Sequence, residues 1–401
     1  MTTVDTGDQR SDSEDVWEVP ERWRTAAEPF RGVNNPKPID LGSTGVHEIL
    51  RSYRPQLEHS LAATRAEGFE HCADEALAYL AAPDTYASTL GAAAVWTLIC
   101  VDFVTCHCAN NYAHSVHVAK FIRDHVVASW VVAHGPAFAA EAALRCADLD
   151  VRHEMVWTLG RQIYPLAPAR TGRREMRYFQ SLAGQIRRVL ATCSDADYAT
   201  AVQRLSALRA ADPDAAIHLG ASYLLPGQQD WLDADLARAD LPDRYTVRHV
   251  APSLTTAAQL ARFLEVGTIQ YWHEGPRYSV LTQVGPPAAD LIIDEFRSAP
   301  AKPAASLRKL AALLAHFPTD AAFRALVDRG ELPAVAPALT TATSNYPRRA
   351  MRLLSADAAD HESPETAERF RLHACAHPHL IASHADPRAL PLLRRADSAG
   401  T

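Results

Sequence analysis

Apolar residues recur every three or four positions along most of this chain. Val46, Ile49 and Leu50 show this spacing near its start, and the spacing continues nearly to its end. Residues three and four apart share one face of an α-helix, so each such segment predicts a helix with one buried side. Strand signals are sparse, because only Tyr245–Val250 and Tyr278–Thr282 form short β-prone runs, and neither defines a sheet. The pattern therefore predicts an all-α fold.

Capping residues and breakers mark the ends of the expected helices. Ser194, Asp212 and Thr319 each stand before an apolar periodic segment, and their side-chain oxygens can accept hydrogen bonds from the first N–H groups of a helix. The pair Gly135–Pro136 interrupts the pattern, since proline does not fit inside a helix. After this break we expect two shorter helices that continue to Tyr164.

A two-helix unit repeats in the C-terminal part of the chain. The two copies are Leu307–His316, Phe317–Pro318 and Thr319–Arg329, and then Leu332–Ser344, Tyr346–Pro347 and Arg348–Ala356. An aromatic–proline pair falls at the same joint in both copies, and the helix-pair period is roughly 35–40 residues, as in HEAT-like repeats. One helix pair cannot bury its apolar face alone, so neighbouring pairs stack. We therefore expect a HEAT-like α-solenoid of stacked helix pairs, with an irregular helical bundle as the alternative.

The chain divides into segments of different composition. Its first fifteen residues are polar and acidic, which is typical of disorder. The next segment is rich in proline and contains Trp17 and Trp23, so we expect an extended arm packed on the body, with a short helix near Glu21–Ala27. The expected organisation is a disordered acidic tail (1–15), the arm (16–43), N-terminal helical repeats (44–240) and C-terminal HEAT-like repeats (241–401).

Charge and cysteine content narrow the class of protein. The 401 residues carry a formal net charge of −7, which argues against a strongly basic nucleic-acid-binding domain. Seven cysteines, an odd number inside apolar patterns, favour free thiols in a reducing compartment. The N-terminus lacks the basic and apolar parts of a signal peptide. The apolar stretch Leu90–Val104 is too short for a membrane span. We expect a cytoplasmic protein that does not enter the membrane.

Four segments together resemble one known family. They are Val19–Arg24 with Pro29 and Arg31–Gly32, Ser222–Pro226 with Asp230–Trp231, Val284–Ala289, and Tyr346–Leu354. In this order they resemble the helical-repeat region of the molybdate metabolism regulator-like proteins, a bacterial family of unknown function that is often linked to a WGR module. No Trp-Gly-Arg motif occurs in this chain. The resemblance implies a helical-repeat architecture and carries no catalytic residue to this sequence.

A first candidate metal site combines cysteine and histidine, which are good zinc ligands. Cys106 and Cys108 are two apart, so they converge only if a loop follows Cys106. His114 and His117 are three apart and share a helical face. A loop and the following turn can bring these four ligands together around zinc. The alternative is a set of buried thiols and surface imidazoles at a turn between two helices.

A second candidate metal site lies near the C-terminus. His373 and His377 are four apart on one helical face, with Cys375, His379 and His384 nearby. Such a pair can bind a metal ion or titrate near neutral pH. No glutamate follows the first histidine, so the metalloprotease pattern is absent. The alternative is an exposed helix that carries incidental histidines.

A third candidate site is basic. Its six residues are Arg170, Arg173, Arg174, Arg177, Arg187 and Arg188. The four arginines in the Arg170–Arg177 stripe have helical spacing, so they can line one face and contact phosphates. The alternative is a solvated face that pairs with acidic neighbours such as Glu175.

Several catalytic motifs are absent from the sequence. The chain has no Gly-x-Gly-x-x-Gly and no Gly-x-x-x-x-Gly-Lys, so dinucleotide and P-loop sites have no support. Ser222 lacks the closing glycine of a nucleophile elbow. We therefore predict a non-catalytic protein-interaction scaffold with an unknown protein partner. The alternatives are a nucleic-acid-binding repeat protein that uses the arginine stripe, and a metal-dependent or other enzyme. No cofactor is predicted apart from the possible zinc.

Overall fold

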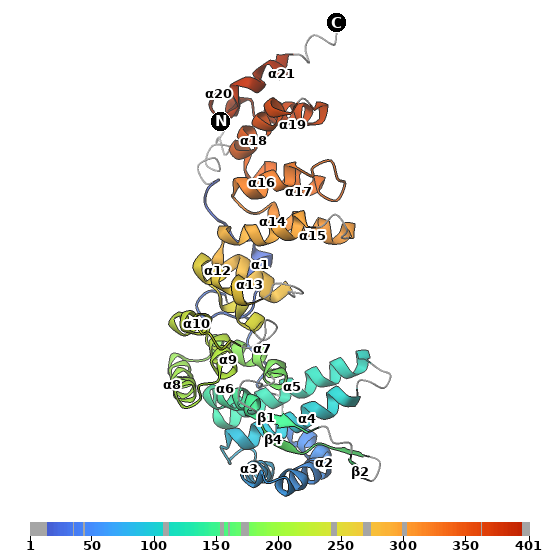
Figure 1. Ribbon diagram of the computed structural model, residues 1–401, viewed down its shortest axis with the longest axis vertical. Coiled ribbons are helices and arrows are strands. Elements are labelled where there is room, and N and C mark those ends of the chain that lie inside the picture. Colours follow the sequence, from blue (N-terminus) through green and yellow to red (C-terminus); the bar gives the residue numbers. More distant parts are fainter. Residues whose placement is uncertain are drawn as a thin grey trace, which may run out of the picture. The chain divides into compact units, whose positions relative to one another are not determined.

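The computed structural model confirms the all-α fold (Figure 1). It describes residues 14–34, 36–42, 45–106, 112–152, 156–158, 161–169, 176–241, 247–267, 274–298, 303–361 and 363–394, and for 102–106, 112–121, 156–158 and 161–163 it describes only the backbone. The chain forms two compact units. Unit 1 comprises Met1–Arg24 and Val280–Thr401, and unit 2 comprises Thr25–Ser279. This division falls after residue 279, whereas the sequence placed a boundary after residue 240.

Unit 2 is built mainly from helices. They are α2 (Val46–Ala66), α3 (Glu70–Ala81), α4 (Thr89–Cys106), α5 (Tyr112–His134), α6 (Pro136–Arg145), α7 (Arg177–Thr192), α8 (Asp195–Ala211), α9 (Ala215–Leu224), α10 (Gln229–Leu236), the 3-10 helix η4 (Arg248–Ser253) and α12 (Ala257–Val266). Helix α6 packs against α4, α5, α7 and α8. Its buried alanines, such as Ala139 and Ala143, let these neighbours approach closely. The apolar stretch at Leu90–Val104 lies in α4, and its described core residues are buried.

Local capping explains where these helices begin. The Ser194 hydroxyl accepts a hydrogen bond from the N–H of Asp197 at 3.1 Å, which confirms the predicted start of α8. The predicted start of α9 at Asp212 is two residues early. Asp214 is the residue whose carboxylate caps this helix, through the N–H of Ala216 at 2.9 Å.

The segment before α7 contains two small β-ribbons where the sequence predicted helix. Strands β1 (Leu149–Val151) and β4 (Leu166–Pro168) pair antiparallel, as do β2 (Val156–Thr158) and β3 (Arg161–Ile163). The prediction of helix up to Tyr164 is therefore wrong. Pro165 and Pro168 have no N–H group and cannot continue a helix. The hydroxyl of Thr64 on α2 accepts the N–H of Leu166 at 2.9 Å and so fixes β4 on the helical body.

The β-prone runs noted in the sequence do not form strands where they are described. Tyr278–Thr282 lies inside α13 (Glu274–Val284), and Arg248–Val250 lies in η4. Val247 of the first run is helical as well, and residues 245 and 246 lie outside the described residues. In both cases the helical pattern of the surrounding segment overrides the local strand preference.

Unit 1 is a helical repeat. Its elements are α14 (Ala289–Arg297), α15 (Ala304–Leu314), α16 (Asp320–Val327), α17 (Ala336–Asn345), α18 (Pro347–Asp360), α19 (Pro364–Ala376), α20 (Ile381–His384), α21 (Leu390–Arg394) and the 3-10 helices η5 (Pro286–Ala288), η6 (Pro378–Leu380) and η7 (Pro387–Ala389). Each of α14, α15 and α16 packs on the next helix and on the second next (Figure 1). The predicted joints Phe317–Pro318 and Tyr346–Pro347 fall between α15 and α16 and between α17 and α18.

The N-terminal arm contains one short helix, α1 (Glu21–Ala26), as its sequence predicts. Before this helix, residues 17–20 have no regular secondary structure. Trp23 is completely buried and anchors the arm. Among the helices in the described ranges, none combines the length and the apolar character that crossing a bilayer requires.

Candidate functional site

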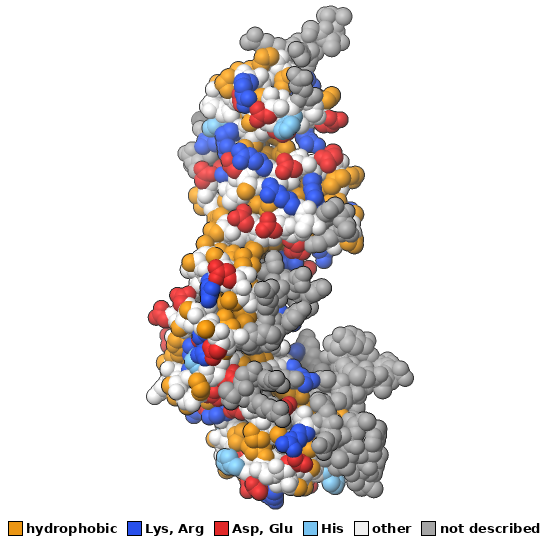
Figure 2. Space-filling view, in the orientation of Figure 1, with side chains coloured by type: hydrophobic (Ala, Val, Ile, Leu, Met, Phe, Trp, Pro, Cys, Tyr) orange, Lys and Arg blue, Asp and Glu red, His pale blue; other side chains and the backbone are white. Residues whose placement is uncertain are grey.

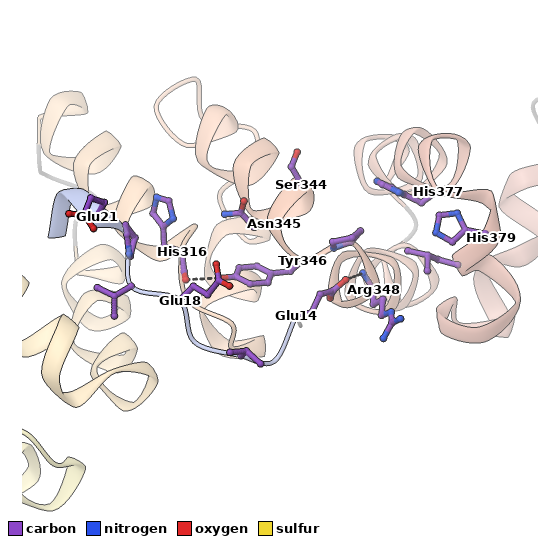
Figure 3. Close-up of a pocket in the computed structure, with 15 residues that line it drawn as sticks. Glu14, Glu18, Glu21, His316, Ser344, Asn345, Tyr346, Arg348, His377 and His379 are labelled. Atoms are coloured by element: carbon purple, nitrogen blue, oxygen red, sulfur yellow. Dashed lines mark hydrogen bonds between the residues drawn. The ribbon is translucent and has the colours of Figure 1, made fainter. Parts of the chain in front are cut away.

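A recess of about 670 Å³ opens on unit 1, and its walls come from parts of the chain that are far apart in sequence (Figure 3). The arm segment 14–21 forms one side. His316 follows α15, residues 344–348 join α17 to α18, and residues 377–380 follow α19. The recess therefore lies where the ends of three helices meet the arm.

A second recess of about 410 Å³ adjoins the first, since Ser344 and His377 line both. Apolar side chains dominate its described lining, including Leu339, Leu354 and Leu372. Leu372 is 63% exposed, which is unusual for a large apolar side chain beside a cavity. We call the two recesses together the unit-1 groove. One of its ends is polar and the other is apolar.

Glu14 closes the polar end of the groove by capping helix α18. Tyr346, the residue before this helix, provides no side-chain cap. Instead, the carboxylate of Glu14 accepts the N–H groups of Arg348 at 2.6 Å and Arg349 at 3.1 Å. The first N–H groups of a helix have no partner inside it, and its N-terminus attracts negative charge. An acidic residue from the arm therefore completes a helix more than 330 residues away.

Aromatic rings hold the next part of the arm. The ring of Trp17 stacks on Phe317, with centroids 4.9 Å apart and planes within 9°. Trp23 lies against the same phenylalanine at 5.7 Å. Gly285 has a φ of +75°, and a Cβ atom there would lie 3.3 Å from the indole nitrogen of Trp17. The glycine thus gives the backbone its turn and leaves room for this ring.

His316 links the arm to the joints between helices. The hydroxyl of Tyr346 donates to the backbone oxygen of His316 at 2.5 Å (Figure 3). Arg22 donates to the Nε2 atom of His316 at 3.2 Å, so this nitrogen carries no proton. Burial and the nearby Arg22 charge lower the pKa of His316. Burial raises the pKa of Tyr346 to about 12.

The polar side chains at the joint between α17 and α18 bond to backbone oxygens. The hydroxyl of Ser344 donates to the backbone oxygen of Thr340 at 3.0 Å, and the amide of Asn345 donates to Ala315 at 3.2 Å. The hydroxyl of Tyr346 is engaged by a carbonyl as well. The lining of the groove also offers carboxylates, imidazoles and a guanidinium.

An ion-pair network lies beside the polar end of the groove. Asp320, at the start of α16, accepts two hydrogen bonds from Arg352 at 2.7 and 2.8 Å and one from Arg349 at 3.1 Å. The pKa of Asp320 is lowered to about 2, and the hydrogen bonds from Arg352 are the largest cause of this lowering. The network therefore favours the ionised carboxylate.

The ion pairs of Asp320 make the stability of unit 1 depend on pH in the acid range. We expect Asp320→Asn to remove this part of the pH dependence. Because the folded carboxyl has the lower pKa, the unfolded chain takes up the proton first, and stability present above pH 4 is lost as the pH falls from about 4 to about 2. Since the side chain is partly exposed, we expect a loss of about 1 kcal/mol at pH 7. Denaturant unfolding at several pH values measures this, with the exposed Asp328→Asn as control. If Asp320→Asn loses as much stability as the wild type between about pH 4 and about pH 2, the low pKa of Asp320 is not the cause of this loss.

The predicted histidine pair does come together. The rings of His373 and His377 lie 4.7 Å apart, although α19 ends at Ala376, just before the second histidine. The Nε2 atom of His373 bonds to the backbone oxygen of Pro347 at 2.9 Å, and burial lowers its pKa. One nitrogen of the pair is thus used to fix α19 on α18. Cys375 is exposed and free.

The other predicted metal ligands lie outside the described side chains. Cys108 lies outside the described residues, and the structure describes only the backbone at Cys106, His114 and His117. In the part of the chain whose side chains are described, no three or more histidine, cysteine, aspartate or glutamate side chains are grouped to hold a metal ion. The zinc site stays a prediction.

The predicted arginines separate into different environments. Arg170, Arg173 and Arg174 lie outside the described residues. Arg177 begins α7 and is exposed, and Arg188 is half-buried. Arg187 is only 1% exposed, and all the hydrogen bonds found for it go to the protein itself. Its burial disfavours Arg187 as a phosphate contact, and the predicted nucleic-acid site as a whole stays a prediction.

Comparison with known sequences identifies the family of unit 2. Residues 43–269, more than half of the chain, match the sequence family described as the YehI second domain. The chain belongs to this family. Neither the curated proteins nor the solved structures contain a match. The YehI second-domain region lies within unit 2, so the unit-1 groove is outside it. The match does not test the resemblance to the molybdate metabolism regulator-like proteins, which stays a prediction.

The YehI second-domain region contains a serine, an aspartate and a histidine that are close together. Asp235 is 1% exposed and accepts from Ser222 at 2.6 Å and from Arg209 at 2.8 and 2.9 Å. His218 lies 3.4 Å from the same carboxylate, and its Nε2 atom contacts backbone oxygens. In a catalytic triad the histidine lies between the serine and the aspartate. Here the serine donates directly to the aspartate, so the cluster is a structural ion-pair network.

The sequence missed the residues that shape the groove. Glu14 and Asp15 were assigned to a disordered tail, yet Glu14 is 9% exposed and caps α18. The remaining tail residues, 1–13, lie outside the described residues. Trp17 and Trp23 were expected to pack on the body, but their partner Phe317 was taken only as a repeat marker. The repeated aromatic–proline joint was the available signal, because it marks the helix ends that receive the arm.

Proposed function

We propose that the chain is a non-catalytic protein-interaction module and that the unit-1 groove binds an extended segment of a partner protein. The observation that carries this proposal is the arm itself. Its residues before α1 form a turn and bend at 14–16 and irregular chain at 17–20, and they line one side of the groove. They are held by a carboxylate at the start of α18 and by a tryptophan on Phe317. A surface that binds one non-helical segment has the donors and the apolar contacts to bind another.

The composition of the groove favours a protein partner. Its apolar end has Leu372 at the rim, and exposed apolar surface beside polar groups is typical of protein interfaces. Figure 2 shows basic and acidic side chains interleaved over the described face of unit 1. A nucleic-acid backbone favours a surface of one positive sign. We also propose a cytoplasmic location, in keeping with the free cysteines at the described positions.

Site-specific photo-crosslinking tests the proposal. A photoreactive amino acid replaces Leu372 in the full-length chain, in the cells that express it naturally. We expect a discrete cross-linked protein that mass spectrometry identifies, because the exposed side chain borders the groove. With the purified partner, Leu372→Glu should weaken binding at least about tenfold, since a charge is then buried against an apolar contact.

Val132 on α5 provides the matched control, because it is an apolar side chain that is 66% exposed on unit 2. The photoreactive group at Val132 should give no adduct with the same protein, and Val132→Glu should leave the affinity unchanged. Equal adducts from both positions would indicate non-specific contact. The absence of any discrete adduct at Leu372 would contradict a protein-binding groove.

A further inference from the structure

We propose that the seat of arm residues 14–17, which adjoins the unit-1 groove, recognises a partner segment in which an acidic pair is followed by an aromatic residue, and that Glu14–Trp17 of the arm is a built-in competitor for that segment. This inference rests on the proposed function and names the chemistry of its ligand. The arm displays the pattern as Glu14, Asp15, Val16 and Trp17. Its contacts show what each position of the ligand must supply.

The end of the site that receives the acidic residues of the ligand has an excess of positive charge. Arg348, Arg349 and Arg352 lie in the first two turns of α18, and Asp320 is the acidic partner that α16 supplies to two of them. The positive end of the helix adds to this charge. In the structure, Glu14 occupies the backbone N–H groups, and Asp15 bonds to Nη2 of Arg349 at 2.7 Å. Two negative charges from the ligand are therefore the complement of this end.

The aromatic end of the site is a flat ring with a glycine beside it. Phe317 is 1% exposed and presents its face to Trp17. Gly285 leaves the space that the indole fills. Three residues span at most about 10 Å, and the turn and bend at residues 14–16 shorten this reach, so a glutamate and a tryptophan three positions later fit both contacts. The site is thus selective for the spacing between the acidic and the aromatic residue of the ligand as well as for their chemistry.

The contacts made by the arm leave part of the site unsatisfied. Among the residues that the structure describes, the Nη1 atom of Arg349 and the indole nitrogen of Trp17, itself part of the arm, are buried and have no hydrogen-bond partner. A buried donor without an acceptor weakens the contact that buries it. The side chain of Asp15 is 91% exposed, so its ion pair is screened by water. A ligand that gives the Nη1 atom of Arg349 an acceptor, and whose own aromatic ring leaves no donor unpaired, would therefore bind better than the arm does.

Release of this segment does not require unit 1 to unfold. Trp23 contacts Phe317 and His316 as well as Trp17, so we expect the first two contacts to hold it when residues 14–17 leave. The segment between the two tryptophans then acts as a short tether. A tethered competitor has an effective concentration on the millimolar scale. It therefore prevents the binding of ligands with low affinity and is displaced by ligands with high affinity.

Peptide binding to the full-length chain tests this inference. The probe is a fluorescent peptide with the sequence of residues 12–20, and the opened variant carries Glu14→Ala, Asp15→Ala and Trp17→Ala. Because the tether no longer competes, we expect the opened variant to bind the peptide at least about tenfold more tightly than the wild type. Glu14→Gln alone keeps Trp17 in place, so its affinity for the peptide should lie between those of the wild type and the opened variant. This single variant replaces the opened variant in the test if the latter is poorly folded.

The controls separate this inference from the proposed function. A peptide with lysines at the two acidic positions, or with alanine in place of tryptophan, should bind neither form. Failure of the original peptide to bind the opened and Glu14→Gln variants at millimolar concentration would overturn the acidic–aromatic ligand, while an adduct at Leu372 would still support a protein-binding groove. A wild-type dimer that the peptide dissociates would also overturn it, because the ligand would then be the arm of a second copy.

Discussion

Replacing Arg187 by alanine is expected to destabilise unit 2 by about 4 kcal/mol or more, because several buried polar groups lose their partner together. The guanidinium donates to the backbone oxygens of Pro29 at 2.6 Å, Tyr223 at 3.1 Å and Pro252 at 2.9 Å, and to the hydroxyl of Ser253 at 3.1 Å. Burial lowers the pKa of Arg187, and the guanidinium lies 4.8 Å from the centre of the Tyr223 ring. One side chain thus joins three separate segments of unit 2.

Arg188→Ala is the matched control for this prediction. Arg188 is the next residue on α7 and is half-buried, and its buried Nε atom has no hydrogen-bond partner within the described part of the chain. Its removal should change the stability by less than about 1 kcal/mol. Denaturant unfolding, with hydrogen exchange read on α7 and α9, measures both variants. Equal losses of stability in the two variants would show that the hydrogen bonds of Arg187 do not hold unit 2 together.

The contrast between these arginines shows which signal the sequence interpretation overlooked. Both were grouped by charge as phosphate contacts. Helical spacing, however, places Arg187 four residues after Ala183 and three before Leu190, both of which are buried. Arg188 is outside this stripe. The periodicity that identified the helices could therefore also have identified Arg187 as a buried residue.

Local signals predicted much of the fold. The caps at Ser194 and Thr319 and the short helix of the arm are confirmed, because hydrogen bonds within a few residues determine them. The β-ribbons near Pro165 were missed, because their strands are three residues long and depend on contact with α2. Elements this short do not show a periodicity of their own.

The contact between Glu14 and α18 had no local signal at all. Composition assigned the acidic residues near the N-terminus to disorder, since nothing near them in the sequence pairs with a carboxylate. Their partners are the N–H groups of a helix in the last quarter of the chain. What the sequence did show was the joint Tyr346–Pro347. A proline at the start of a helix fixes the backbone but supplies no cap, so such a joint leaves N–H groups for another segment.

Both aromatic–proline joints therefore have two roles. Phe317 ends one turn between helices and stacks on Trp17, whereas Tyr346 precedes α18 and bonds to His316. The same residues that set the repeat geometry thus form the site for the arm. This explains why a candidate site appears where the repeat pattern is strongest, although none of the metal-ligand or arginine patterns led to it.

Replacing Asp235 by alanine is the second change that we expect to have a large effect, with a loss of about 3–5 kcal/mol in the stability of unit 2. Its carboxylate is almost fully buried and pairs with both terminal nitrogens of Arg209, which is itself stacked on Trp231 at 4.7 Å. Without Asp235, the Arg209 charge stays in a buried position without its carboxylate, and the Ser222 hydroxyl loses its acceptor.

A double variant separates the cost of an unpaired charge from the net contribution of the ion pair. Arg209→Met combined with Asp235→Leu removes both charges and keeps much of the buried volume, and such replacements are often nearly neutral. We therefore expect the double variant to regain most of the stability that Asp235→Ala loses in denaturant unfolding. Asp230→Ala, at an exposed position of the same helix, should cost less than about 1 kcal/mol. A double variant as unstable as Asp235→Ala would mean that the pair itself, and not the uncompensated charge, determines the stability of this region.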